Sequence, residues 1–365
     1  MPWSGVTAAG ASDAAVVAHA PTALHADTAQ STSTRRVWFV DALRLLAAFQ
    51  MLQGHTLAAL LAPEVRHGAW YTAWSNVRGL TSVCFLFTAG MAFYFATAPR
   101  YAAHRRSAPA IAKRCWRALR LIGLGYALHL PVPALLTAAA APSGALREWL
   151  AVDVLQCIGV SLLVLELTVV CASSVRVWLC LVGGAAVLFA FGTPWAYQLS
   201  MTEPHALAAY VGPLLGSQFP LWPWAAHMFA GVLAAAWAGG SRSNAGLRLL
   251  GAGATLLAGG RLLLAAGMLG VVVDHIYRLG WVVLLAAGLA WATRSVRRPP
   301  GWLAVLAAET LFLYVIHVVL VYGRPWGLAA SIGPRLSLAA GLTAAVAVIS
   351  VSATAALGFR ALRSR

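Results

Sequence analysis

Apolar runs of about 20 residues recur along the chain, and they limit its fold more than any other feature of the sequence. A helix of that length crosses the roughly 30 Å hydrocarbon core of a bilayer. The runs occupy residues 38–61, 77–98, 116–138, 150–171, 176–196, 219–238, 247–271, 279–293, 301–322 and 336–358. Only 10% of the 365 residues are charged, whereas a soluble domain carries about 25%. The sequence therefore predicts an all-α fold, a polytopic membrane helical bundle of about ten transmembrane helices.

The basic residues give the predicted bundle a direction. With the N-terminus placed in the cytoplasm, eighteen of the 26 Lys and Arg residues fall in inner segments and six in outer segments. Cytoplasmic loops of membrane proteins carry such an excess. We therefore expect a multi-pass protein of a bacterial-type inner membrane, with both termini cytoplasmic. Because the net charge of +16 sits in short loops between apolar runs, it does not indicate a nucleic-acid partner.

The chain is expected to divide into a tail and one helical domain. Residues 1–34 are rich in Ala, Thr and Ser and lack the basic start of a signal peptide. We interpret them as a disordered cytoplasmic tail, followed by a helical domain at 35–365. The five cysteines have no CxxC spacing, so no metal site is predicted. The lipid bilayer is the expected partner; a homo-oligomer or a larger membrane complex fits the same composition.

Three ionisable residues share one face of the first apolar run. At 100° per residue, Asp41, Arg44 and His55 fall on a single stripe, with His55 about 21 Å from Asp41 and near the outer interface. Ionisable groups inside a membrane are costly and mark functional sites. Two structural interpretations compete with catalysis: Asp41 and Arg44 can pair and extend to the interface, and His55 can be a hydrogen-bonded structural histidine.

Other polar residues are expected at a similar depth. His317 lies in the outward-running run at 301–322, while Asp153 and Gln156 begin the run at 150–171. His67 and Arg78 lie in the outer segments. Each residue alone is typical of a solvated or capping position. Two histidines and a carboxylate converging near the outer face predict a general base for a hydroxyl or amine.

A basic segment is predicted at the inner face. It includes Arg105, Arg106, Lys113, Arg114 and Arg117. Such a segment binds anionic lipid headgroups. It also suits a polyphosphate such as the nucleotide end of coenzyme A, through arginine–phosphate contacts. Both interpretations stay open, and they do not exclude each other.

Several segments resemble the transmembrane acyltransferase superfamily, which includes bacterial acyltransferase-3 proteins and relatives of heparan-α-glucosaminide N-acetyltransferase. The first is the spacing from Asp41 through Arg44 to His55. The others, in chain order, are RGLTSVCFLFTAG (78–90), VDVLQCIGV (152–160), FPLWPWAAHMFAGVLAA (219–235), YRLGWVVLL (277–285) and LFLYVIHVVL (311–320). The chain differs from the pattern at Leu45, where the family usually has glycine, and it lacks an acidic residue before the second-helix segment.

The resemblance implies a function and roles for these residues. It implies transfer of an acyl group, expected to be acetyl, from cytoplasmic acyl-CoA (acetyl-CoA) to a glycan, lipid or small molecule near the outer face, without a metal. His55 corresponds to the essential histidine of the acyltransferase-3 branch, and His67 to the catalytic loop histidine of the lysosomal enzyme. His55 would then act as general base or as transient acyl carrier, and Asp41 and Arg44 would orient or bind substrate. The candidates for the acceptor side are His317, Asp153, Gln156, His67 and Arg78. The rival interpretation is a transporter, flippase or accessory subunit with the same fold and no chemistry.

Overall fold

The computed structural model of the protein describes residues 37–130, 149–201, 205–213, 216–239, 244–268, 270–296, 298–323 and 326–364. Within these ranges the chain is helical apart from turns and one isolated parallel bridge between Leu61 and Leu336. The predicted all-α class is confirmed for this part of the chain. The expected disordered tail at 1–34 lies outside the described residues.

The helices follow the apolar runs of the sequence, although their ends differ. They are α1 (Trp38–Leu60), α2 (Gly68–Gly79), α3 (Thr81–Thr97), α4 (Tyr101–His104), α5 (Ala108–Leu128), α8 (Val154–Cys171), α9 (Val175–Phe191), α10 (Thr193–Ser200), α11 (His205–Val211), α12 (Leu221–Ala238), α13 (Ala245–Ala265), α14 (Gly270–Ala292), α15 (Gly301–Ala308), α16 (Thr310–Tyr322), α17 (Leu328–Ser331) and α18 (Leu338–Arg363). The run expected at 279–293 is a longer helix, because α14 already begins at Gly270.

Five helical stretches of the described chain are long and apolar enough to cross a membrane. These are Gly68–His104, α8, α13, α14 and α18. The count rises to seven if the bent pairs α9–α10 and α15–α16 each form one span. Three further helices, α1, α5 and α12, have 23, 21 and 18 residues but do not join this group. Charged side chains interrupt α1 and α5, and α12 contains Pro223, His227 and three Trp residues, which lower its mean hydropathy.

Two of the expected straight spans are broken. The α9–α10 pair bends by 60° after Gly192, and Pro194, near the start of α10, has no N–H to continue the helix. The α15–α16 pair bends by 70° at Glu309, whose backbone leaves the helical region with φ −101° and ψ 27°. Neither break is marked by a loss of apolar residues, so the apolar runs alone predict continuous helices there.

Glycines allow α3 and α12 to cross with their backbones in contact. A Cβ added to Gly90 would lie 1.9 Å from the carbonyl oxygen of Met228, and one added to Gly231 would lie 2.1 Å from that of Phe87. Small residues at helix crossings let membrane helices pack this closely. The two glycines therefore fix the crossing point from both sides.

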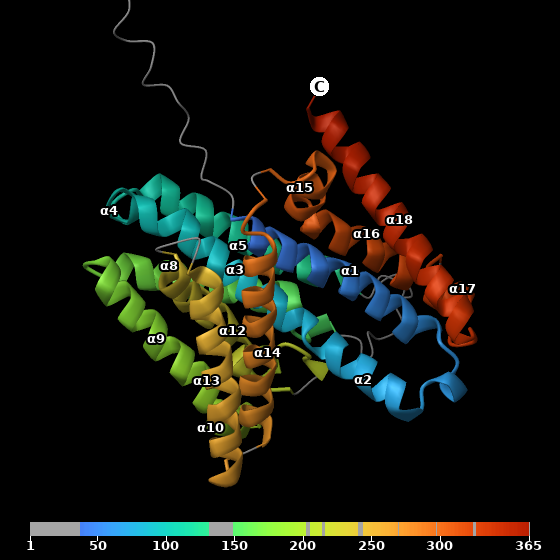
Figure 1. Ribbon diagram of the computed structural model, residues 1–365, viewed down its shortest axis with the longest axis horizontal. Helices are drawn as coiled ribbons and strands as arrows, with labels where there is room; N and C mark the ends of the chain where they lie inside the picture. Colours follow the sequence, from blue (N-terminus) through green and yellow to red (C-terminus); the bar gives the residue numbers. More distant parts are fainter. Residues whose placement is uncertain are drawn as a thin grey trace, which may run out of the picture. The chain divides into compact units, whose positions relative to one another are not determined.

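Helix α1 lies in the interior of the bundle and carries the polar stripe of the sequence. It packs against α3 and α14 on one side and against α15, α16 and α18 on the other, as Figure 1 shows. Two hydrogen bonds through Leu336 tie its C-terminal end to the segment before α18: Leu336 N donates to Leu60 O, and Ala62 N donates to Leu336 O. The first and the last described helices of the chain are thus joined beside His55.

Candidate functional site

His55 of α1 and His317 of α16 are directly hydrogen bonded. The Nδ1 atom of His55 lies 2.9 Å from Nε2 of His317, and the ring centroids are 5.0 Å apart. His317 is completely buried, whereas His55 is partly exposed. The structure thus brings the two histidines together across a sequence separation of 262 residues.

The partners of the two rings determine where their protons lie. Nδ1 of His317 is 3.2 Å from the carbonyl oxygen of Leu313. A carbonyl can only accept, so this nitrogen carries the proton and Nε2 of a neutral His317 is an acceptor. Nδ1 of His55 must then donate to it, which leaves the lone pair of a neutral His55 on Nε2. An imidazole in this tautomer can take a proton from a substrate.

Behind His317 lies a carboxylate. The hydroxyl of Tyr314, one helical turn before His317, donates to Oδ2 of Asp153 over 3.0 Å. Asp153 also accepts from the backbone N–H of Val154 at the start of α8, and Nε2 of His129 lies 3.6 Å from it. The Tyr314 and His317 rings meet edge to face, with centroids 5.4 Å apart. Asp153 therefore lies at the site, as expected, and it holds α16 against α8.

An arginine and aromatic rings surround the other side of His55. The guanidinium of Arg78 stacks over Trp74, 5.2 Å from the ring centroid, and the indole Nε1 of Trp74 donates to Gln53. The hydroxyl of Tyr322 donates to the carbonyl of His55 over 3.2 Å. Arg78, which the sequence predicts as an acceptor-side candidate, thus lies beside His55. The positive charge of Arg78 and the negative charge of Asp153 both interact electrostatically with the His55 ring, with opposite effects.

Two other predicted acceptor-side residues lie apart from the histidine pair. His67 is an exposed residue just before α2, and no contact joins it to His55 among the described residues. Gln156 is completely buried, packed against Gly125 of α5, and neither atom of its amide has a hydrogen-bond partner within the described chain. The structure brings neither residue to the His55 ring.

The remaining residues of the polar stripe lie at the opposite end of α1. Asp41 and Arg44 approach to 4.0 Å, and Arg44 donates to the carbonyl of Thr88 on α3 over 3.3 Å. The eleven residues between Arg44 and His55 span about 17 Å of helix. The pair therefore cannot touch the groups that His55 touches, and the interpretation as a local ion pair agrees with its geometry.

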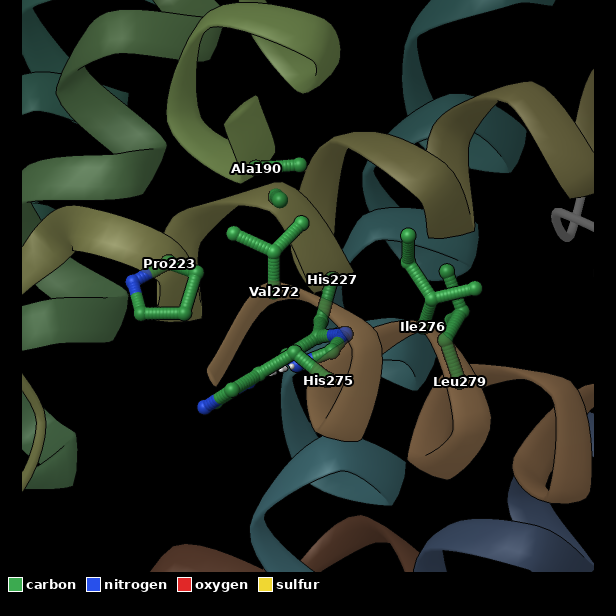
Figure 2. A pocket seen from close by; sticks show the side chains of 8 residues that line it. Ala190, Pro223, His227, Val272, His275, Ile276 and Leu279 are labelled. Atoms are coloured by element: carbon green, nitrogen blue, oxygen red, sulfur yellow. Dashed lines mark hydrogen bonds between the residues drawn. The ribbon is translucent and has the colours of Figure 1, made fainter. Parts of the chain in front are cut away.

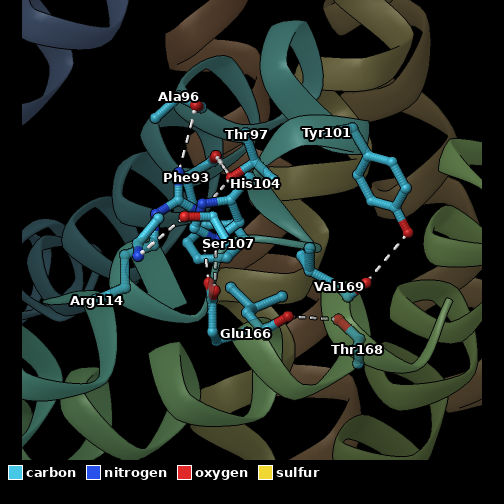
Figure 3. A network of polar contacts seen from close by, with 12 residues as sticks. Phe93, Ala96, Thr97, Tyr101, His104, Ser107, Arg114, Glu166, Thr168 and Val169 are labelled. Atoms are coloured by element: carbon cyan, nitrogen blue, oxygen red, sulfur yellow. Dashed lines mark hydrogen bonds and ion pairs between the residues drawn. The ribbon is translucent and has the colours of Figure 1, made fainter. Parts of the chain in front are cut away.

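The basic segment forms α4, α5 and the turn between them, and part of it is anchored by a buried carboxylate. Arg114 donates to Glu166 of α8 over 3.4 Å and to Thr97 over 2.8 Å, and His104 meets the other oxygen of Glu166 at 2.5 Å. Figure 3 shows these side chains converging; they come from α3, α4, α5 and α8. Arg105 donates to the carbonyl of Ser173. Arg114 and Arg105 are thus engaged within the bundle.

The other expected phosphate ligands of this segment are Arg106, Lys113 and Arg117, and all three are exposed. The sequence reasoning missed Glu166, although a single acidic residue within the apolar run LLVLELTVV is a signal of a buried ion pair. His129 was missed as well, because its acidic partner Asp153 lies 24 residues away in the sequence.

A second histidine pair, which the sequence reasoning also missed, lies between α12 and α14. Nε2 of His227 is 2.9 Å from Nδ1 of His275, and the two rings stack at 21°. They line a small cavity of about 30 Å³ together with apolar residues of α9, α12 and α14, shown in Figure 2. His227 is 2% exposed, and its Nδ1 has no partner among the described residues. Its surroundings are apolar, in contrast to those of His55.

No group of three or more His, Cys, Asp or Glu side chains is arranged to hold a metal ion within the described ranges. The arrangement around His55 offers instead an imidazole base, a neighbouring carboxylate and a neighbouring guanidinium. These groups are suited to proton transfer.

Comparison with known families gives one match. The family model for the catalytic region of heparan-α-glucosaminide N-acetyltransferase matches residues 36–265, which is more than half of the chain. The matched region contains His55, Arg78 and Asp153, whereas His317 lies beyond it. No curated protein and no solved structure matches the chain.

Proposed function

Because the chain belongs to the heparan-α-glucosaminide N-acetyltransferase catalytic family, we propose that it is a membrane-bound acetyltransferase that uses acetyl-CoA from the cytoplasm. The acetyl group passes to a hydroxyl or amine of a glycan, lipid or small molecule near the outer face. The observation that carries this proposal is the hydrogen bond between His55 and His317. It prepares Nε2 of His55 as a base at one end of the bundle.

The proposed topology has ten spans with both termini in the cytoplasm of a bacterial-type inner membrane. It counts each bent pair as one span, which gives seven candidate spans, and adds α1, α5 and α12. The support is that each is at least 18 residues long, and that the arginine distribution favours this orientation. In this topology the His55 end of α1 faces outward, and the basic segment of α4 and α5 faces the cytoplasm.

The basic segment then binds the nucleotide end of the donor. Arg106, Lys113 and Arg117 are exposed and can contact phosphates, while Arg114 is held by Glu166. The thioester end of the donor has to approach His55 between the helices, because the basic segment and His55 lie at opposite ends of the bundle. This arrangement lets an acetyl group cross the membrane without the nucleotide.

His55 acts as the general base in the proposed reaction. Its Nε2 takes the proton of the acceptor as the acceptor heteroatom bonds to the thioester carbonyl carbon. The tetrahedral intermediate then collapses, the C–S bond breaks, and His55 returns the proton to the leaving thiolate. Asp153, which acts on the His55 ring electrostatically, stabilises the imidazolium between these two steps. General-base catalysis of this kind contributes about 10²–10⁴-fold.

The test compares His55→Ala with His67→Ala in purified protein and in membranes, with radiolabelled acetyl-CoA as donor. His55→Ala should lose acetyl transfer by about 10²-fold or more while it still binds acetyl-CoA. His67→Ala should retain activity, because His67 lies outside the histidine pair. The assignment fails if His55→Ala is fully active or if His67→Ala alone is inactive. A wild-type protein that neither binds nor consumes acetyl-CoA would favour a transporter or an accessory subunit instead.

A further inference from the structure

Arg78 is held in a fixed position next to His55. Its guanidinium stacks on Trp74, which is itself oriented by its hydrogen bond to Gln53. The aliphatic part of the side chain lies against Gly54, the residue before His55, because a Cβ added there would meet Cγ and Cδ of Arg78 at 3.0 Å. A glycine at 54 thus makes room for the arginine. Stacking and close packing of this kind restrict the side chain in advance, so less conformational entropy is lost when it binds a reacting group.

The partners of Arg78 differ from those of two other outer arginines, Arg66 and Arg278. Arg66 donates twice to the carbonyl of Leu61, and Arg278 is bonded to the carboxylate of Asp274 at 2.8 Å and to the carbonyl of Gly79. Within the described residues Arg78 forms no hydrogen bond and no ion pair, and its guanidinium lies over the Trp74 ring. A guanidinium keeps its charge in a partly buried position and has five N–H donors. Those donors are available to a group at the site.

The proposed reaction separates charge in a way that the site matches. When His55 takes the acceptor proton, a positive charge forms on its ring and a negative charge forms on the former carbonyl oxygen of the thioester. Asp153 lies behind the histidine pair, through Tyr314. Arg78 lies against the neighbouring residue Gly54, and its charge acts on both His55 and Tyr322. One carboxylate and one guanidinium thus flank the place where both charges develop.

We propose that Arg78 is a catalytic residue that stabilises the oxyanion of the tetrahedral intermediate. This inference rests on the proposed acetyl transfer. The N–H donors of Arg78 bind the carbonyl oxygen as the acceptor attacks, and they release it when the C–S bond breaks and the thiolate takes its proton from His55. Preorganised donors aimed at developing charge often contribute more to such catalysis than any other single effect. Arg78 itself neither gains nor loses a proton.

Four variants test this role in acetyl-transfer assays with acetyl-CoA and one neutral acceptor. Arg78→Gln removes the charge, and Arg78→Lys keeps it without the planar donors. Gly54→Ala leaves Arg78 intact but places a methyl group 3.0 Å from its side-chain carbons. Arg278→Gln is the matched control, because that outer arginine is already paired with Asp274. Size-exclusion profiles in detergent and acetyl-CoA binding establish that each variant is folded.

For the Arg78 and Gly54 variants we expect a loss in kcat, with little change in the KM of acetyl-CoA or in the KM of the acceptor. Arg78→Gln should lower kcat by about 10²–10³-fold, the effect of losing an oxyanion donor, and free guanidinium ion should restore part of it. Arg78→Lys and Gly54→Ala should fall between Arg78→Gln and wild type, and Arg278→Gln should stay near wild type. Rescue by guanidinium is not expected of a structural residue.

Three outcomes would overturn the role of Arg78 without contradicting the proposed function. In the first, Arg78→Gln equals Arg278→Gln while His55→Ala is inactive. In the second, Arg78→Gln raises the KM of the acceptor and leaves kcat unchanged, which would make Arg78 a substrate anchor. In the third, guanidinium ion gives no rescue of a folded Arg78→Gln protein. A fully active His55→Ala variant would instead overturn the proposed function itself.

Discussion

Replacing Gly90 by alanine should force α3 and α12 apart. The added Cβ would lie 1.9 Å from the carbonyl oxygen of Met228, whereas a carbon and an oxygen in contact are about 3.3–3.6 Å apart. Backbone atoms on both sides prevent a local escape, so the helices must separate by about 1.4 Å or more at this point. Even a gap of about 0.5–1 Å forfeits about a quarter to a half of the dispersion energy of the contacts across it.

The size of the effect follows from the side chains at the crossing. Phe87 of α3 and Phe229 of α12 are completely buried, and a buried side chain of this size makes about 40–60 contacts of about 0.1–0.2 kcal/mol each. Losing a quarter of them costs about 2 kcal/mol per side chain. We therefore expect Gly90→Ala to lower the free energy of unfolding by about 3–4 kcal/mol, at or above the range of overpacked cores.

The assay is unfolding by SDS titration in mixed micelles, and two comparisons make it specific. Gly288→Ala is the control, since nothing lies within 4 Å of its added Cβ, and it should gain about 0.5–1 kcal/mol from better helix propensity. Gly231→Ala should be as harmful as Gly90→Ala. The double variant should be much less harmful than the sum, because the first methyl already separates the helices. If Gly90→Ala is as stable as Gly288→Ala, the reasoning about this crossing is wrong.

Three further predictions concern polar contacts of the bundle. Glu166→Leu should destabilise the protein by about 3 kcal/mol in SDS titration, because it leaves the partly buried Arg114 without its carboxylate; an unchanged midpoint would contradict this. Tyr314→Phe removes a hydrogen bond to a charged carboxylate, worth about 1.5–3 kcal/mol, and should lower both the thermal midpoint and acetyl transfer; full activity would show that Asp153 does not act through this contact. His275→Ala leaves both ring nitrogens of the buried His227 unpaired, at a cost of about 1–3 kcal/mol, which the further change His227→Leu should restore in the same titration.

The sequence predicts the helical bundle well because apolar runs of bilayer length can form few structures other than membrane-spanning helices. It predicts the breaks poorly, since Glu309 lies within a run that is apolar on both sides, and only the packing around it decides that the helix bends there. It also predicts ten spans, whereas α1 and α5 carry charged side chains: Arg114 of α5 pairs with the buried Glu166, while Lys113 and Arg117 are exposed.

The candidate site can be predicted in part from the same sequence patterns. Helical phase and depth are enough to bring His55 and His317 to one level, and the structure joins them. Helical phase does not determine which residues of separate helices are in direct contact. The contact between Tyr314 and Asp153 and the pairing of His227 with His275 therefore became visible only in the structure. Arg78 illustrates the same limit, because its importance comes from Gly54 and Trp74 rather than from its own position in the sequence.

The hydrogen bond between His55 and His317 also has a consequence for how the protein is made. The two histidines are separated by 262 residues, so His55 has left the ribosome long before its partner is translated. Throughout most of synthesis the nascent chain holds an imidazole without the acceptor that sets its tautomer. The chemistry proposed here can begin only after α16 has been inserted against α1. A truncated chain that stops before α16 would therefore be a membrane protein without a working base.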